Sequence, residues 1–403
     1  MSRPAEQMTL ASSDPDSVPV SSSRRLVLAG SLLGLLLIGV VIVLLREQLL
    51  PARFFYDGDT IQVIAQQRGY AQSDFSYQAA ASVYRLLGLA DDATAAALVS
   101  FAAYLVVLAA ACRGLMTTRY PRSAVVLVGA SVVFGAIYLG TYSKDVMLAP
   151  VVAVVLLTRR SWLGELAIIA SICAYAEVFR TYWFIIAVTY IALRLALRWR
   201  PRVRTVVLVG LLLAGCAAVA MSIVLGVAPD SFRTSSNTGR VDSADAASTI
   251  PAFIPGGTLA SGTINIVLAL VSLALPLPLA LKGGAYFLAL SALIGVFWIR
   301  AASIGRRELA GPGSSAAQRR LAFLVGFLIV QSLFEPDFGS ALRHLTPLLP
   351  IAVALFIARD DQRAVGVERA GPARWLRTGR GPGKAGAVPT WPTPQGLPGG
   401  PQR

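Results

Sequence analysis

The chain contains 403 residues, of which 55% are hydrophobic and only 14% are charged, and its formal net charge at pH 7 is +15. Soluble proteins carry about 25% charged residues, so this composition excludes an ordinary soluble enzyme. The positive charge does not indicate a nucleic-acid partner, because the arginines form short clusters between apolar runs, where they orient membrane spans. The sequence therefore predicts an all-α protein that crosses a membrane several times.

Hydropathy predicts about ten transmembrane helices, the longest of which hold about 20 apolar residues, enough to span roughly 30 Å of hydrocarbon. The predicted spans lie at 25–45, 94–112, 123–141, 146–158, 162–179, 182–198, 204–227, 284–300, 321–334 and 345–358. With ten spans, every arginine cluster falls on one face, which predicts that this face and both termini are cytoplasmic. The transmembrane domain would occupy 23–363, and the polar tails 1–22 and 364–403 are expected to be disordered.

The segment 263–281 is also apolar and complicates the number of spans. If it crossed the membrane fully, the arginine cluster at 300–320 would face outward. Pro276 and Pro278 interrupt the segment near its end, which favours a re-entrant or interfacial segment. Eleven full spans are the alternative.

Acidic residues concentrate on the opposite, outer face, and the first group of interest lies in the outer loop 46–93 after the first span. Here Asp57 and Asp59 flank Gly58. If the backbone turns at the glycine, both carboxylates can converge on one cation or one hydroxyl group. An ordinary turn with two solvated acids is the alternative.

The second group is Ser143-Lys144-Asp145, which separates two predicted spans with almost no loop between them. Ser143 is placed to cap the next helix, and Asp145 would lie in its first turn, where the helix dipole favours an anion. Capping does not explain Lys144. A cation at this position suits a phosphate or a carboxylate partner.

The third group contains Glu177, Arg180, Tyr182 and Trp183. Residues three apart share a face of a helix, so Glu177 and Arg180 could simply neutralise each other. Ionisable groups inside a membrane are costly, however, and usually indicate a functional site. Tyr182 and Trp183 could supply a stacking surface for a sugar or anchor the chain at the interface.

The fourth group, Glu335, Asp337, Arg343 and His344, is a polar break before the last span. A lone histidine is more often structural than catalytic. Arg343 is the better candidate for a functional role, because a guanidinium stays charged and binds two phosphate oxygens at once. The outer loop 229–262 is interpreted either as a lid or as an ordinary solvated loop.

Taken in order, these motifs resemble those of the polytopic polymerases of bacterial surface polysaccharides, the Wzy and EpsG-type membrane proteins. The shared order is an aromatic-Asp segment after the first span, a Ser-Lys-Asp motif, an Arg-x-Tyr motif and a late Arg-His pair, here at 56–59, 143–145, 180–182 and 343–344. The resemblance extends over about residues 25–358. It implies a glycosyltransferase in the bacterial plasma membrane that joins polyprenyl-diphosphate-linked oligosaccharides into an exopolysaccharide or O-antigen-like chain on the extracytoplasmic face.

This resemblance, together with the chemistry of the side chains, gives each candidate a role. Cations would stabilise the diphosphate leaving group, a base would deprotonate the acceptor hydroxyl, and the remaining groups would hold the substrate or orient the cations. The catalytic candidates are Asp57, Asp59, Arg180, Glu335, Arg343 and His344. The substrate-binding candidates are Lys144, Asp145, Glu177, Tyr182, Trp183 and Asp337. No cofactor is required, although Asp57 and Asp59 could together hold a divalent cation.

The expected partners are the lipid bilayer, a polyprenyl-diphosphate-linked oligosaccharide, and flippase and chain-length regulator proteins. Two alternatives remain open. The acidic pair after the first span also resembles the first outer-loop motif of GT-C glycosyltransferases, which use a polyprenyl-phosphate sugar donor. A non-enzymatic flippase or transporter of lipid-linked oligosaccharide is the second alternative, but polar residues that gather on one side favour an enzyme.

Overall fold

The computed structural model describes residues 22–67, 74–113, 122–158, 161–239, 248–255, 257–309 and 315–357. These residues form helices, and the only strand-like pairing among them is an isolated antiparallel bridge between Thr249 and Asp337. The prediction of an all-α chain is confirmed for this part of the protein. Residues 1–21 of the predicted N-terminal tail and the whole of 364–403 lie outside the described residues.

Five helices in the described ranges are long and apolar enough to cross a membrane. They are α5 (Ala93–Ala111), α10 (Val203–Leu225), α14 (Ala285–Glu308), α15 (Ser315–Phe334) and the continuous segment Phe338–Ile357. The last segment contains α16 (Phe338–Leu345) and the short turn η6 (Thr346–Leu348). The structure is thus that of a membrane protein with several apolar helices.

Helices also occupy the other predicted spans. These are α1 (Ser22–Leu44), α6 (Arg122–Phe134) continued by the π-helix η3 (Gly135–Leu139), η4 (Asp145–Leu148) continued by α7 (Ala149–Leu157), α8 (Trp162–Val178) and α9 (Trp183–Trp199). The segment 263–281 forms most of α12 (Leu259–Ala274), followed by the single turn α13 (Leu277–Ala280). The 16 residues of α12 rise about 24 Å, less than the hydrocarbon core, and Pro276 follows its end.

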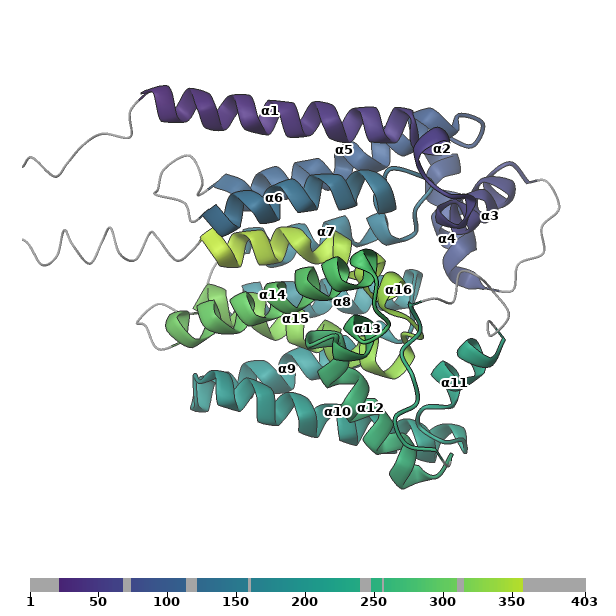
Figure 1. The fold of residues 1–403 in the computed structure, drawn as a ribbon, viewed down its shortest axis with the longest axis vertical. Coiled ribbons are helices and arrows are strands. Elements are labelled where there is room, and N and C mark those ends of the chain that lie inside the picture. The colour runs from purple at the N-terminus through teal and green to yellow at the C-terminus, as the bar shows by residue number, and fades with distance from the viewer. Residues whose placement is uncertain are drawn as a thin grey trace, which may run out of the picture. The chain divides into compact units, whose positions relative to one another are not determined.

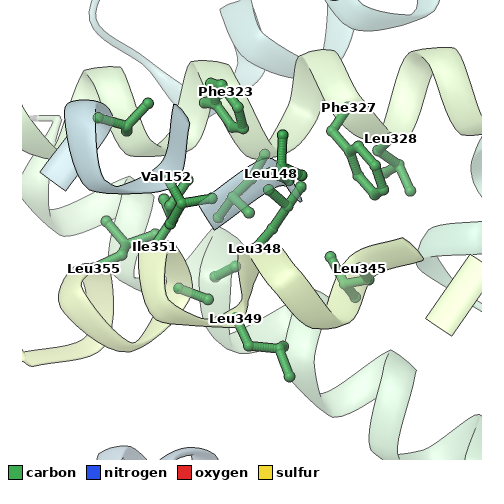
Figure 2. Packing of buried hydrophobic residues seen from close by; sticks show 14 of the residues in the cluster. Leu148, Val152, Phe323, Phe327, Leu328, Leu345, Leu348, Leu349, Ile351 and Leu355 are labelled. Carbon is green, nitrogen blue, oxygen red and sulfur yellow. The ribbon is translucent and has the colours of Figure 1, made fainter. Parts of the chain in front are cut away.

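The helix α15 is the most enclosed of the long helices. In α15, 83% of the apolar window is buried within the protein, compared with 22% in α10. The helix lies against α9, α10 and α12 (Figure 1). The segment after α16 is almost as enclosed, and Figure 2 shows Leu348 and Ile351 packed against Leu148 and Val152. The core therefore holds the end of η4 and the start of α7 beside the last span.

The predicted outer loop 46–93 is largely helical. It contains α2 (Arg46–Leu49), the turn η1 (Ala52–Phe54), α3 (Tyr56–Ala65) and α4 (Phe75–Leu86). The last two pack against each other beyond the ends of the long helices (Figure 1). Their small apolar core is built on Ile61, Ala80, Tyr84 and the adjoining Tyr142. We call α3 and α4 the outer helical pair.

Candidate functional site

All four polar groups predicted from the sequence contribute side chains to one cluster. The cluster lies where the outer helical pair meets the beginnings of η4 and α9 and the last turn of α16. Its members are Asp57, Tyr77, Lys144, Asp145, Arg180, Tyr182, Glu335, Arg343 and His344. Segments nearly 300 residues apart in sequence thus meet at one site.

Asp145 is the centre of this cluster. Its side chain is only 3% exposed, and each of its carboxylate oxygens binds a different arginine. Arg180 Nη2 lies 2.6 Å from Asp145 Oδ1, and Arg343 Nε lies 3.0 Å from Asp145 Oδ2. Because a buried charge needs partners of opposite charge, Asp145 holds both guanidinium groups in fixed positions.

The backbone around Asp145 is held by the outer helical pair. The hydroxyl of Tyr84 accepts a hydrogen bond from Ser143 N at 2.9 Å and lies 3.1 Å from Ser143 O. The hydroxyl of Tyr142 donates to the carbonyl of Leu89 at 2.5 Å. The predicted capping by Ser143 is wrong, because Lys144 occupies the N-cap position of η4 and no side chain caps this helix. The Oγ of Ser143 instead accepts a hydrogen bond from Asp145 N, two residues on, at 3.2 Å. This turn places Lys144 and Asp145 side by side at the site.

Arg180 owes its position to the end of a helix. The helix α8 ends at Val178, so the chain turns before Arg180 and directs it toward Asp145. Its Nη1 donates to the hydroxyl of Tyr182 at 2.8 Å, and its Nη2 lies 3.4 Å from His344 Nε2. Tyr182 therefore takes part in the cluster through its hydroxyl.

His344 and Glu335 form a close pair. His344 Nδ1 lies 2.7 Å from Glu335 Oε2, and His344 Nε2 faces Asp145 Oδ1 at 3.7 Å. Burial acts to raise the pKa of Glu335, but the neighbouring His344 and Arg180 outweigh burial and keep the pKa below its usual range. Because Nδ1 is held by Glu335, Nε2 is the ring nitrogen that faces Asp145 and Arg180.

Asp57 reaches the same cluster from α3. Its Oδ2 lies 2.7 Å from Arg343 Nη2 and 3.5 Å from Lys144 Nζ, and its Oδ1 accepts from the hydroxyl of Tyr77 at 2.5 Å. The ammonium group of Lys144 also lies 3.7 Å from the centre of the Tyr77 ring, a cation–π contact. Burial acts to raise the pKa of Asp57, but the positive charges of Arg343 and Lys144 outweigh burial. The pKa of Asp57 therefore lies below its usual value, and the carboxylate stays ionised.

The predicted convergence of Asp57 and Asp59 is wrong. Both residues lie in the first turn of α3, and residues two apart on a helix point to different sides. Asp59 is exposed, and its pKa is raised by partial burial and by Glu47. Gly58 is helical and serves close packing, because a Cβ there would lie 2.8 Å from Thr141 Oγ1. In the described ranges no group of three or more His, Cys, Asp or Glu residues could hold a metal ion.

Three further candidates, Glu177, Trp183 and Asp337, are not members of the cluster. Glu177 is exposed at the end of α8, and Arg180 pairs with Asp145 instead of with Glu177. Trp183 is 1% exposed and packs edge-on against Tyr175, with 4.6 Å between ring centroids, so its ring cannot stack on a sugar. Asp337 caps α16 by accepting from Ser340 N at 2.8 Å.

Sequence reasoning missed two contributors to the site. Tyr77 was only one of several aromatic residues in a presumed loop, and the helix α4 that directs it toward Asp57 was not predicted. Arg233, on α11 (Ser231–Thr238), is 3% exposed and donates to the carbonyl of Glu335 at 3.1 Å. Burial lowers the pKa of Arg233 to about 10. No sequence pattern distinguished this arginine from those around it.

The described part of the loop 229–262 is attached to the polar break before α16. The amide of Ile250 donates to the carbonyl of Pro336 at 2.9 Å, and Asn237 Nδ2 donates to the carbonyl of Ile250 at 3.1 Å. Residues 240–247 and 256 of this loop lie outside the described residues. In its described part the loop supports the backbone that carries Glu335.

No model of a known protein family matches the chain, and neither a curated protein nor a solved structure matches it.

Proposed function

We propose that the protein is a polysaccharide polymerase, a glycosyltransferase that joins polyprenyl-diphosphate-linked oligosaccharides into a longer chain. The observation that carries this proposal is the combination of two anchored arginines with a histidine–carboxylate pair in one cluster. Sugar transfer from a lipid diphosphate needs both functions. Positive charge must stabilise the departing diphosphate, and a base must accept the proton of the attacking hydroxyl.

The guanidinium groups of Arg180 and Arg343, with the ammonium group of Lys144, form the binding site for the diphosphate. Asp145 fixes the two arginines before substrate arrives, so little reorganisation is needed when charge develops on the leaving group. A guanidinium can donate two parallel hydrogen bonds to phosphate oxygens. Arg343 is bound to Asp145 through Nε, and its Nη2 lies against the more exposed carboxylate of Asp57.

His344 is the general base. Its Nε2 accepts the proton of the acceptor hydroxyl as the hydroxyl oxygen bonds to the anomeric carbon of the donor. The bond between that carbon and the diphosphate oxygen breaks, and the lipid diphosphate leaves with the electron pair. Glu335, at 2.7 Å from Nδ1, orients the ring and stabilises its protonated form.

The arrangement in the membrane is part of the proposal. The helix α9 starts beside Arg180 and ends among the exposed residues Arg198, Arg200 and Arg202, so the site and an arginine cluster lie at opposite ends of one helix. By the positive-inside rule, these arginines at the end of α9 and both termini are cytoplasmic. The site then faces outward from a bacterial plasma membrane. About ten helices span the bilayer, and α12 with α13 is re-entrant.

Two observations make the alternatives weaker. The GT-C-type transferase rested on a paired acidic motif, and Asp59 does not join Asp57. A flippase or transporter carries its substrate past the bilayer midplane, whereas the proposed diphosphate ligands Lys144, Arg180 and Arg343 gather in one cluster beside α3 of the outer helical pair.

The test is an activity assay of the purified protein in nanodiscs. The only substrate supplied is lipid-linked oligosaccharide extracted from the cells in which the protein occurs. A ladder of lengthening products is expected, and Arg180→Ala and Arg343→Ala should abolish it. Arg198→Ala, which removes an exposed arginine from the far end of α9, is the matched control. A single addition would indicate a GT-C-type transferase. The absence of any product would refute the proposed reaction.

A further inference from the structure

The cluster is electrically balanced before any substrate binds. Its ion pairs contain three cations, Lys144, Arg180 and Arg343, and three carboxylates in contact with them or with His344. The nearby Arg233 donates to the backbone carbonyl of Glu335 and is not part of these pairs. A diphosphate adds at least two negative charges to this enclosed site. Since unbalanced charge is costly where water is scarce, one of the carboxylates must give up its place to the incoming phosphate.

Of the three carboxylates, Asp57 is the one that can leave. The side chain of Asp57 is 25% exposed, compared with 3% for Asp145 and 5% for Glu335. Asp145 holds both arginines, and Glu335 holds His344, so displacing either would dismantle the site. Asp57 belongs to the separate outer helical pair and lies at the outer edge of the cluster.

The position of Asp57 also matches that of a phosphate oxygen. A single oxygen, Oδ2, lies within ion-pair distance of both Arg343 Nη2, at 2.7 Å, and Lys144 Nζ, at 3.5 Å. If this carboxylate moved away, Arg343 would still be held through the Nε contact with Asp145. Arg343 and Lys144 would then both face the position that Asp57 Oδ2 had occupied, and an anion could bind there to both cations.

We infer that Asp57 is a displaceable counter-ion that occupies the position of a phosphate of the lipid-linked diphosphate. This inference rests on the proposed function for the identity of the ligand. A ligand must compete with a carboxylate already bound to two cations, so a group with several charges succeeds where one with a single charge fails. Asp57 therefore makes the site bind the diphosphate carrier in preference to the surrounding phospholipids, whose phosphodiesters carry one charge.

The test is a calorimetric titration of the full-length protein in nanodiscs with inorganic pyrophosphate. Asp57→Asn should bind pyrophosphate about tenfold more tightly than wild type, because a charged competitor is removed. Asp59→Asn is the matched control, since it removes the same charge from an exposed residue two positions away, and its affinity should stay close to wild type. Equal or weaker binding by Asp57→Asn, or no binding by any of the proteins, would overturn the inference.

A second variant tests the same idea without changing the charge. Tyr77→Phe removes the hydroxyl that holds Asp57 Oδ1 but keeps the ring beside Lys144, so it should bind pyrophosphate about two- to fivefold more tightly. Unchanged binding would contradict the displacement model even if Asp57→Asn failed to fold.

Two comparisons identify the source of the diphosphate and separate this inference from the proposed reaction. Farnesyl diphosphate should bind at least about tenfold more tightly than pyrophosphate, and equal affinities would contradict the assignment to a lipid carrier. Tighter pyrophosphate binding by Asp57→Asn without a product ladder would support the phosphate position and refute the polymerase. A ladder with unchanged pyrophosphate binding would refute the counter-ion alone.

Discussion

Asp145→Asn removes the charge at the centre of the site and keeps the shape of the side chain. In the wild type this carboxylate binds Arg180 at 2.6 Å and Arg343 at 3.0 Å. Arg343 retains its contact with Asp57 in the variant. Arg180, whose side chain is 8% exposed, is left with the neutral hydroxyl of Tyr182 and with His344 as polar neighbours.

The expected loss of stability follows from these contacts. Removing one member of a buried ion pair costs about 3–5 kcal/mol, because the other charge stays buried. Here only Arg180 loses its carboxylate entirely, and the new amide oxygen still accepts a hydrogen bond. We therefore expect the free energy of unfolding to fall by about 3 kcal/mol, and Tm by about 4 °C, because the unfolding entropy of a chain of this size is large. Polymer formation should fall by at least about 100-fold, because Arg180 loses its carboxylate partner and Arg343 loses one of its two.

Glu165→Gln provides the matched control. Glu165 also binds two arginines, Arg194 and Arg319, but it lies near the start of α8, at the opposite end from Arg180. Thermal unfolding and polymer formation should be measured on both variants in the same nanodiscs. Glu165→Gln should lower Tm and leave the rate per folded molecule close to wild type. If both variants lower this rate equally, Asp145 is only a structural residue and the reasoning is refuted.

Three other changes test the packing and charge of the site. Gly58→Ala places a methyl group 2.8 Å from Thr141 Oγ1, so it should lower the free energy of unfolding by about 1–3 kcal/mol and weaken polymer formation, whereas an unchanged Tm would contradict the close packing. Tyr84→Phe removes the partner of Ser143 N and should cost about 1–3 kcal/mol in chemical unfolding; a change near zero would show that the turn is held otherwise. The ion pairs that lower the pKa of Asp57 in the folded protein stabilise the fold when this carboxylate is ionised. This stabilisation is fully present above the ordinary pKa of 3.8 and is lost as pH falls through the lower pKa of the folded state. Tm should therefore drop between pH 5 and pH 3 by less in Asp57→Asn than in wild type, and equal drops would contradict the ion pairs of Asp57.

The membrane character of the chain could be predicted from hydropathy because long apolar runs have few structural alternatives. The convergence of the polar groups was expected for a related reason. Charges such as Asp145 and Arg180 interrupt apolar segments, and charges in such surroundings need partners. The identity of the partner was not predictable. Local spacing indicated a pair between Glu177 and Arg180, but α8 ends at Val178 and the contact is made across the fold.

The outer helical pair could not be predicted from the sequence. Its helices are short, and their apolar residues face a small core completed by Tyr142, which is distant in sequence. Without α3, the glycine between Asp57 and Asp59 appeared to be a turn residue. The burial of Trp183 was equally hidden, because a tryptophan at a span boundary is typical of interfacial anchors as well as of packed cores.

The central claim is that Lys144, Arg180 and Arg343 bind the diphosphate of the lipid carrier. The most direct test is a cryo-electron microscopy structure of the protein in a nanodisc that contains a polyprenyl diphosphate. We expect phosphate density within about 3 Å of both guanidinium groups, with the carboxylate of Asp57 moved away from Arg343. Diphosphate density elsewhere in the protein, with Asp57 still bound to Arg343 and Lys144, would contradict it.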